Sequence, residues 1–406
     1  MKLGLMITEF PGQTHVAMWR VGQAMRELGV DVQFLSTRRA AAEARCHDFL
    51  IEEATRTHYI YPPNPVAVLV AMMGSPFGVW RSLKYITGLE ESSFSNKLRY
   101  LLLLLCAADL KHYCQHEGIQ HVFIHSCADA AHIGAMGFLL GGATYSLRLG
   151  GALGTYGHDH FSKMSHAAFI AAAAKPTRQQ VLDEVSIPAE QVYSVWLGVD
   201  TQRFVPPPNR EFEVGKLRLI TVARLNVGKG HRYAIAAVRR LLDQGLDIHY
   251  TLVGSGAYES ELHQLIDKLG LGEKVVLIGA QGESKVIESL QSSDVFVLPS
   301  TSKGEASPVA ALEAMSCGLP AVCSIIGGTP DIVTDGVNGF LVEQKDEKAL
   351  AERLYQLAQD IDLRKRMSQS ARERAVESFD CRVSAQRILD AIKTHCHCFD
   401  RRLHAQ

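Results

Sequence analysis

The second half of the chain alternates short apolar segments with amphipathic ones so regularly that few folds can accommodate it. Strands are predicted at LRLITVAR, IHYTLVG, KVVLIGA, DVFVLP, PAVCSI and GFLV. A helix between consecutive strands demands a right-handed crossover and parallel pairing. The pattern therefore predicts a doubly wound α/β domain. Its predicted helices are His231 to Leu242, Tyr258 to Leu269, Ser284 to Leu290, 329–335 and those from Asp346 onward.

The first half begins with the same kind of unit, although the alternation becomes less regular later. A strand from Leu3 to Ile7 is followed by the loop TEFPGQTH, a helix that Gly29 ends, and a second strand, VDVQFLS. The segments HVFIHS (121–126) and TYSLRLG (144–150) continue the pattern. We therefore expect a second Rossmann-like domain.

A proline-rich stretch separates the two halves. The sequence LGVDTQRFVPPPNREFEVGK has little apolar periodicity, which is typical of a linker. We predict an N-terminal domain at 1–196, a linker at 197–216, a C-terminal domain at 217–378, and a crossover helix with a tail at 379–406. Because ligands bind outside the carboxyl ends of parallel strands, the predicted site is a cleft between the two sheets.

Composition narrows the environment and the partners. The formal net charge is −1, so there is no global field for nucleic acid, and none is expected as a partner. The chain has nine cysteines and no C-x-x-C pair, which indicates reduced thiols in a cytoplasmic protein. The opening residues, MKLGLMITEF, read as a strand rather than as a signal peptide.

Two apolar runs, at 66–73 and 100–108, are too short to cross a bilayer, which takes about 20 residues. The first run is followed by aromatic side chains interleaved with basic ones, a mixture that occurs in helices at a membrane interface. Peripheral contact with the inner face of the cell membrane is one interpretation, and a plain buried helix is the other. The residues concerned are Phe77, Trp80, Arg81, Lys84 and Tyr85.

The stretch KGEASPVAALEAMSCGLP (303–320) contains a helix start. Ser307 suits the N-cap and Pro308 the first helical position. The free N–H groups that follow, at Val309 and Ala310, would suit a phosphate group.

Two carboxylates flank this helix start. Glu305 lies in the preceding loop, and Glu313 lies about a turn and a half inside the helix. Because a carboxylate repels phosphate, both are predicted to accept hydrogen bonds from hydroxyls. A ligand with hydroxyls on both sides of a diphosphate is a sugar nucleotide. The plainer alternative is a solvated loop acid and an exposed helix residue.

A second stretch, ARLNVGKGH, places two cations at the carboxyl end of the domain's first strand. Arg224 ends that strand, and Lys229 lies in a glycine-flanked loop before a helix. The two could clamp a diphosphate and neutralise a departing one. Basic residues are also common in ordinary turns, so this signal alone leaves both interpretations open.

Together, ARLNVGKG and EASPVAALEAMSCGLPAV resemble the C-terminal signature of family 4 glycosyltransferases, which have the GT-B fold. The resemblance implies retaining transfer of a hexose or related sugar from a UDP- or GDP-sugar to a glycan or lipid-linked acceptor. It implies no metal and no other cofactor. On the matching positions, Arg224 and Lys229 would bind the diphosphate, Glu305 the donor sugar and Glu313 the ribose. The implied pathway is bacterial surface or exopolysaccharide assembly.

The resemblance extends to other segments. The base would lie near GAQGES, at Gly279 and Gln281, and the loop TEFPGQTH would border the cleft through Gly12, Gln13, Thr14 and His15. The family often carries a histidine after a middle strand, and here that position is Gly150. Nearby, GTYGHDHFSK offers His158, Asp159, His160 and Lys163, either as cleft residues or as exposed polar surface.

Two other functions stay open at this point. With Gly150 in place of the family histidine, the chain could be a non-catalytic nucleotide-binding subunit. It could also be a sugar nucleotide epimerase or a phosphorylase on the same fold. NAD is not expected, because GSGAYESEL lacks the third glycine of a dinucleotide fingerprint. The D-x-D at Asp360 and Asp362 lies in a helical stretch remote from the predicted cleft and is not expected to bind metal.

Overall fold

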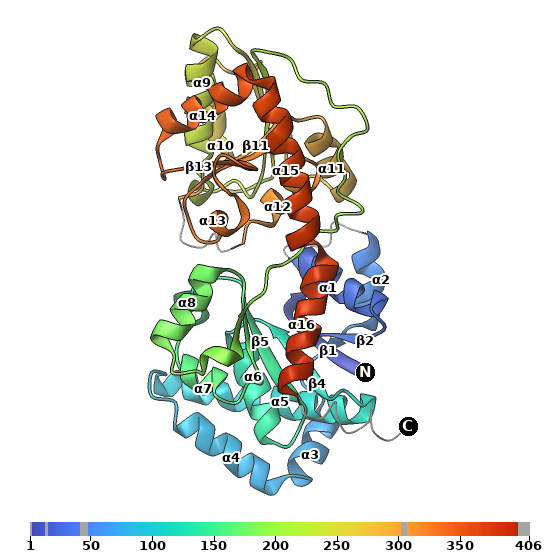
Figure 1. The fold of residues 1–406 in the computed structure, drawn as a ribbon. Coiled ribbons are helices and arrows are strands. Elements are labelled where there is room, and N and C mark those ends of the chain that lie inside the picture. Colours follow the sequence, from blue (N-terminus) through green and yellow to red (C-terminus); the bar gives the residue numbers. More distant parts are fainter. Residues whose placement is uncertain (1, 13–14, 41–47, 302–306, 397–406) are drawn as a thin grey trace. The chain divides into compact units, whose positions relative to one another are not determined.

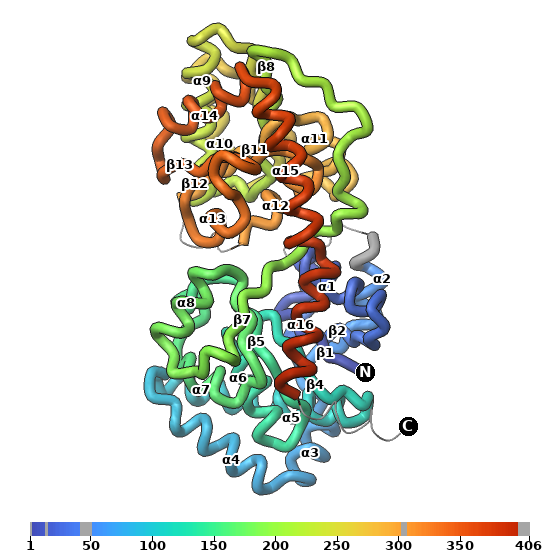
Figure 2. Tube along the Cα trace, viewed as in Figure 1, coloured from blue at the N-terminus to red at the C-terminus, as the bar shows by residue number. Residues whose placement is uncertain are grey.

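The computed structural model describes residues 2–12, 15–40, 48–301 and 307–396. The chain divides into two compact units (Figures 1 and 2). The N-terminal unit is Met1–Leu197 together with the segment from Ser384 onward, and the C-terminal unit is Gly198–Val383. Each unit is built on one parallel sheet.

The sheet of the N-terminal unit has seven strands in the order β3-β2-β1-β4-β5-β6-β7. All neighbouring pairs are parallel, so every strand ends at the same edge. The order reverses between β1 and β4, which is where doubly wound sheets bind ligands. The strands are β1 (Lys2–Phe10), β2 (Asp31–Arg39), β3 (His58–Tyr59), β4 (His121–His125), β5 (Thr144–Leu149), β6 (Ile170–Ala172) and β7 (Val192–Ser194).

Helices cover both faces of this sheet. One core lies between the sheet and the helices from α3 to α8, with Met6, Ile124 and Leu147 fully buried in it. On the other face α1 packs closely on β2, since a Cβ at Gly22 would lie 2.6 Å from Cζ of Phe34. The helices are α1 (Val16–Glu27), α2 (Asp48–Arg56), α3 (Pro65–Met73), α4 (Pro76–Thr87), α5 (Phe94–Glu117), α6 (Asp129–Leu139), α7 (His160–Met164) and α8 (Lys175–Glu184).

The end of the described chain also belongs to the N-terminal unit. Helix α16 (Cys381–His395) passes into this unit at Ser384. His395 Nε2 lies 2.7 Å from the Tyr193 hydroxyl, and Cys396 Sγ lies 3.2 Å from His121 Nδ1. The last turn of α16 is therefore anchored to β4 and β7.

The sheet of the C-terminal unit has six parallel strands in the order β10-β9-β8-β11-β12-β13. Its order reverses between β8 and β11. The strands are β8 (Lys216–Val222), β9 (Asp247–Val253), β10 (Val275–Leu277), β11 (Val295–Leu298), β12 (Ala321–Ser324) and β13 (Gly339–Val342). The helices are α9 (His231–Asp243), α10 (Glu259–Lys268), α11 (Glu283–Gln291), α12 (Val309–Ser316), α13 (Thr329–Ile332), α14 (Glu347–Gln359) and α15 (Ile361–Phe379).

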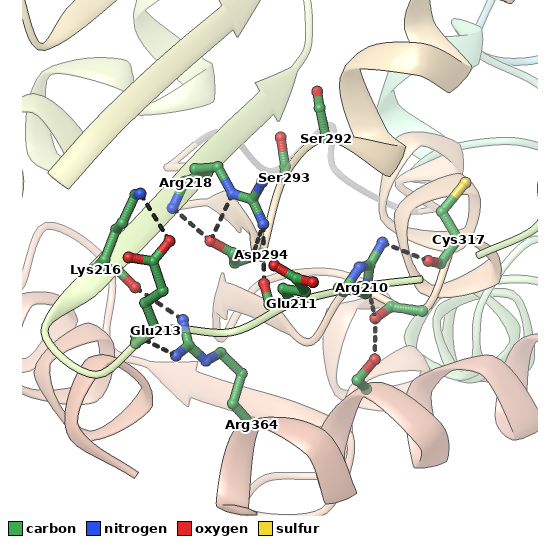
Figure 3. Close-up of polar contacts among 12 residues, drawn as sticks. Arg210, Glu211, Glu213, Lys216, Arg218, Ser292, Ser293, Asp294, Cys317 and Arg364 are labelled. Carbon is green, nitrogen blue, oxygen red and sulfur yellow. Dashed lines mark hydrogen bonds and ion pairs between the residues drawn. The ribbon is translucent and has the colours of Figure 1, made fainter. Parts of the chain in front are cut away.

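The stretch predicted as a linker packs against the C-terminal unit (Figure 3). Arg210 donates from Nη1 to the Gly318 carbonyl at 2.6 Å and from Nη2 to the Cys317 carbonyl at 2.9 Å. Arg364 of α15 donates to the carbonyls of Lys216 and Glu213 at 2.9 and 2.8 Å. The stretch has few apolar side chains to pack, and paired hydrogen bonds from arginines hold it in place instead.

One predicted helix is shorter than expected. The helix predicted at 329–335 ends at Ile332, because Asn338 Oδ1 accepts from the Thr334 N–H at 2.8 Å and turns the chain.

Among the described residues, no single helix is long and apolar enough to cross a membrane. The pair α3 and α4, bent by 102°, passes that test together by length and composition.

Candidate functional site

Two loops of the C-terminal unit meet where the order of its sheet reverses. One follows β8 and the other follows β11. The Thr301 N–H donates to the Gly228 carbonyl at 2.8 Å, which joins them directly. Gly230 has φ +72°, and a Cβ there would lie 1.8 Å from the Pro299 carbonyl oxygen. No other residue fits this contact, so the glycine holds the loops together.

The loop after β8 carries both predicted cations. Arg224 is exposed and lies two residues beyond the end of the strand. Lys229 is half-buried at the end of a single 3₁₀ turn, where its N–H donates to Asn226 Oδ1 at 3.2 Å. Burial lowers the pKa of His231, so this histidine is neutral, and its Nε2–H donates to the Arg224 carbonyl at 3.1 Å. The backbone of this loop is thus held from both ends.

The loop after β11 leads into α12, which begins at Val309. The predicted N-cap is wrong by one residue, because Pro308 occupies that position with extended backbone angles and offers no capping side chain. Ser307 Oγ is instead buried, without a hydrogen-bond partner among the described residues. The N–H groups of Val309 and Ala310 have no acceptor within the helix, as in the first turn of any helix, and the phosphate site there stays a prediction.

The other residues predicted to bind the nucleotide-sugar donor differ in their burial and contacts, and one of them lies outside the described residues. Glu313 is half-buried on α12, whereas Glu305 lies outside the described residues. Gly279 has φ +72°, and its carbonyl accepts from the Gly254 N–H at 2.9 Å, which ties the loop after β10 to the end of β9. The Gln281 side chain donates to the Ile278 carbonyl and so stabilises its own turn. The structure brings Arg224, Lys229 and the start of α12 to one edge of this sheet.

The N-terminal unit places a second group of predicted residues at the carboxyl edge of its own sheet. Gly12 follows β1, and its carbonyl accepts from the His15 N–H at 3.0 Å, at the start of α1. Burial lowers the pKa of His15. Gln13 and Thr14 lie outside the described residues. Gly150 follows β5, and its N–H donates to the Tyr156 hydroxyl at 2.7 Å.

In the GHDH loop, the Asp159 side chain is used in contacts within the fold rather than being free to contact a ligand. Asp159 is buried, and its carboxylate accepts from the Ser92 hydroxyl and from the Glu91 N–H, the latter at 3.0 Å. It therefore pins this loop to the turn before α5. His158 remains exposed, with Nδ1 3.9 Å from Glu91 Oε2. His160 is partly buried, and burial lowers its pKa.

Sequence reasoning overlooked two residues at this edge. Arg148 and His125 occupy neighbouring strands, with Nη1 of the arginine 3.4 Å from Nδ1 of the histidine. Both lie in segments predicted only as strands. A charged residue within the apolar run TYSLRL was the available signal, since an arginine is rarely buried without a partner.

A cavity of about 420 Å³ was also overlooked, and it lies in the N-terminal unit where the sheet order reverses. Polar lining residues include Thr8 of β1, Thr37 of β2 and Ser126 in the turn after β4, and the charged ones are Arg38 and Asp129. Apolar lining residues include Leu103 of α5 and Ile133 of α6. Its chemistry suits an amphiphilic ligand.

Comparison with known proteins identifies part of the chain. Residues 207–374 match the family model described as glycosyl transferases group 1. The chain is 35% identical over 207 residues to WcaL of Escherichia coli (strain K12), a protein named as a glycosyltransferase of colanic acid biosynthesis. It is 35% identical over 185 residues to the amylovoran biosynthesis glycosyltransferase AmsK of Erwinia amylovora. The matches cover 50% and 45% of this chain, and the chain spans only about half of these relatives, 51% and 45% of their lengths.

Solved structures resemble the whole chain. A glycosyltransferase from Rickettsia africae ESF-5 has a TM-score of 0.74 and 16% identity, covering 98% of each chain. Anabaena Alr3699/HepE in complex with UDP has a TM-score of 0.72 and 17% identity, covering 97% of this chain and 99% of its own. The predicted fold class is therefore confirmed: two Rossmann-like parallel-sheet domains, as in GT-B enzymes.

Proposed function

We propose that this chain is a retaining glycosyltransferase that moves a hexosyl group from a UDP- or GDP-sugar to a glycan or lipid-linked acceptor in exopolysaccharide assembly. One observation carries the proposal. Where the order of the C-terminal sheet reverses, two cations and the start of a helix lie on loops joined by the contact between Thr301 and Gly228. The names of WcaL and AmsK support the pathway, and the UDP bound by HepE supports the donor class.

The proposed chemistry needs no metal or other cofactor. Arg224, Lys229 and the N–H groups at the start of α12 would hold the diphosphate and neutralise its charge as the glycosidic bond breaks. Glu305 would bind the donor sugar and Glu313 the ribose hydroxyls. Retention would follow from attack on the same face of the sugar, with the leaving diphosphate accepting the acceptor proton.

The test is a panel of UDP- and GDP-sugars with measurement of nucleotide release and analysis of the sugar product. A transferase releases nucleotide when an acceptor is present and retains the anomeric configuration. Glu305→Ala should abolish transfer with folding intact, while Glu352→Ala on α14 is the matched surface control. Nucleotide affinity without turnover would establish the binding-subunit alternative. An isomerised donor, or a requirement for inorganic phosphate, would establish the epimerase or the phosphorylase.

We also propose that the N-terminal unit, which would bind the acceptor, contacts a membrane through α3, α4 and the first turns of α5. Figure 1 shows α3 and α4 on the periphery of the N-terminal unit. The segment 65–88 contains no acidic residue. Phe77 and Trp80 stack at 5.4 Å, with the Arg81 guanidinium over one ring and the Lys84 ammonium over the other. The exposed apolar side chains are Val66, Leu69, Val70, Met73, Phe77, Trp80, Leu83, Phe94, Leu98, Leu101 and Leu102.

This arrangement favours a bilayer with anionic lipids over a protein partner. Aromatic rings with flanking cations are typical of helices that lie in the interface plane. Leu101 and Leu102 of α5 are exposed, and Leu103 of the same helix lines the cavity, so one side of α5 reaches the surface and another the cavity.

Sedimentation with vesicles of phosphatidylglycerol and phosphatidylcholine tests the membrane contact. The wild type should bind more at higher anionic content, and the double variant Phe77→Ser, Trp80→Ser should lose most of that binding. Val376→Ser, an exposed apolar residue of α15, should bind as the wild type does. Equal binding by the double variant would rule out this surface.

A further inference from the structure

Arg148 is a buried cation that has no counter-ion among the residues described by the structure. It lies near the end of β5 and is 1% exposed. Its Nη1 is 3.4 Å from His125 Nδ1, and its Nε and Nη2 have no hydrogen-bond partner among the described residues. A guanidinium normally uses its two-pronged edge to hold a carboxylate or a phosphate. Here that edge is unoccupied by any described residue.

The electrostatic surroundings do not compensate the charge. Burial lowers the pKa of Arg148 to about 10, and among the described residues the phenol of Tyr156 is the group that opposes this shift. Burial also raises the pKa of that phenol, so it stays neutral. Removing a charge from water without a partner is strongly unfavourable. Structures retain such a residue when something else depends on it.

The groups around Arg148 also favour an anion. His125 contacts it, and burial lowers the pKa of His125 far enough to keep the ring neutral. The rings of His125 and His15 meet edge to face at 5.8 Å, and His15 is the residue before α1. Helix α1 has twelve residues and no acidic residue in its first turn. Its positive end therefore adds to the charge of the guanidinium.

Gly150 places no side chain over Nη1 of Arg148. A Cβ built there would lie 3.5 Å from Arg148 Nη1 and 3.5 Å from the Tyr156 hydroxyl oxygen. Gly150 does not have a positive φ, so the backbone alone does not require a glycine. The residue is partly exposed, whereas Arg148 beneath it is not. A larger side chain would cover the guanidinium from the carboxyl edge of the sheet.

We propose that Arg148, reached over Gly150 and supported by His125 and the start of α1, binds an oxyanion of a substrate. The inference rests on the proposed transfer function and assigns part of its binding site. The oxyanion is a phosphate or a carboxylate, and it has two sources: the diphosphate of the donor, or an acidic group on the acceptor sugar. In either case the ligand would approach past Gly150 toward Nη1, the guanidinium nitrogen nearest that residue, and form a charge-assisted contact there.

The first test compares two fully buried arginines by thermal unfolding without ligand. Arg148→Met replaces an uncompensated charge by an apolar chain of similar length, so the melting temperature should rise by a few degrees. Arg364→Met is the matched control, because Arg364 donates to the carbonyls of Lys216 and Glu213, and its melting temperature should fall. A similar fall in both variants would mean that Arg148 is structural and would overturn the proposal.

The second test measures affinity by calorimetry for pyrophosphate, UDP, GDP and glucuronate. Arg148→Met should weaken at least one of these by tenfold or more, and Gly150→Ala, which fits without clashes, should weaken the same ligand with folding intact. Loss of pyrophosphate and nucleotide binding identifies the donor diphosphate as the source, and selective loss of glucuronate identifies an acidic acceptor. Unchanged affinities in both variants would overturn the proposal.

Arg224→Ala separates this inference from the proposed function. If Arg224→Ala abolishes nucleotide binding while Arg148→Met changes no affinity, the transfer function stands and the Arg148 site fails. If the wild type binds pyrophosphate through Arg148 and turns over no nucleotide sugar, the oxyanion site stands and the transferase assignment fails.

Discussion

Arg210 and Arg364 of the C-terminal unit and Arg148 of the N-terminal unit use their donor groups in opposite ways. In the C-terminal unit, Arg210 and Arg364 each donate from both terminal nitrogens to backbone carbonyls and thereby hold the segment before β8. In the N-terminal unit, Arg148 has one long contact, to His125, and no carbonyl partner among the described residues. The difference lies in the terminal nitrogens, since Nε has no partner among the described residues in any of the three arginines. It separates a structural cation, whose terminal donors are used within the fold, from one that we propose keeps a terminal donor for a ligand.

The units also differ in their buried histidines. His121, His125 and His132 of the N-terminal unit all have a pKa lowered by burial, with values of about 3 for His121 and His132. In the described C-terminal unit, burial lowers the pKa of His231. The N-terminal unit thus carries more groups that must stay neutral for it to remain folded.

The largest expected effect on stability comes from replacing a glycine by alanine, and it should differ between the carboxyl edges of the two sheets. Gly230→Ala should destabilise the C-terminal unit by more than about 4 kcal/mol, because the new Cβ would lie 1.8 Å from the Pro299 carbonyl oxygen and the backbone has φ +72°. Gly150→Ala should change stability by less than about 1 kcal/mol. Urea unfolding of the full chain measures both. A stable Gly230→Ala variant would mean that the loops after β8 and β11 are not held as described.

The next largest expected effect on stability comes from removing an arginine that donates to backbone carbonyls. Arg210→Met should cost about 2 to 4 kcal/mol, because it leaves buried carbonyls at Cys317 and Gly318 without their charged donor. The measurement is the urea midpoint of the C-terminal unit. A stability gain, as expected for Arg148→Met, would remove the distinction between the two kinds of arginine.

Lowering the pH should destabilise the N-terminal unit more than the C-terminal unit. The pKa of His121 and of His132 is about 3 in the folded state and about 6.5 when unfolded, so their contribution is complete above pH 6.5 and is lost as the pH falls toward 3. At pH 5.5 each should cost about 1.4 kcal/mol. Hydrogen exchange at pH 7.5 and 5.5, corrected for intrinsic rates, resolves the two units. Equal losses in both would contradict the comparison.

The smallest expected effect is at the surface. Arg240 and Glu347 form an exposed ion pair at 2.7 Å in the C-terminal unit. Arg240→Ala should change the free energy of unfolding by less than about 1 kcal/mol, because water and salt screen exposed pairs. A larger loss in urea unfolding would show that charge pairs, rather than arginine–carbonyl contacts, stabilise this unit.

Much of the fold was predictable because strand and helix periodicities are local. The strands of the C-terminal unit and the start of α12 near residue 308 follow directly from them. The segment at 198–215 was less predictable, because its stability comes from Arg210 and Arg364, whose partners are distant in sequence. The predicted N-cap at Ser307 was wrong for a local reason, since the backbone of Pro308 takes that position.

Residue type and spacing alone were enough to place Arg224, Lys229 and the first amides of α12 near one another, because neighbouring parallel strands end at the same edge of a sheet. They could not place Arg148 beside His125 or leave its donors unpaired. That outcome depends on the register of β4 against β5, on the helix that brings His15 to His125, and on the missing side chain at Gly150. Local propensity determines which segments form strands, whereas burial and partner choice arise only when distant strands pack together.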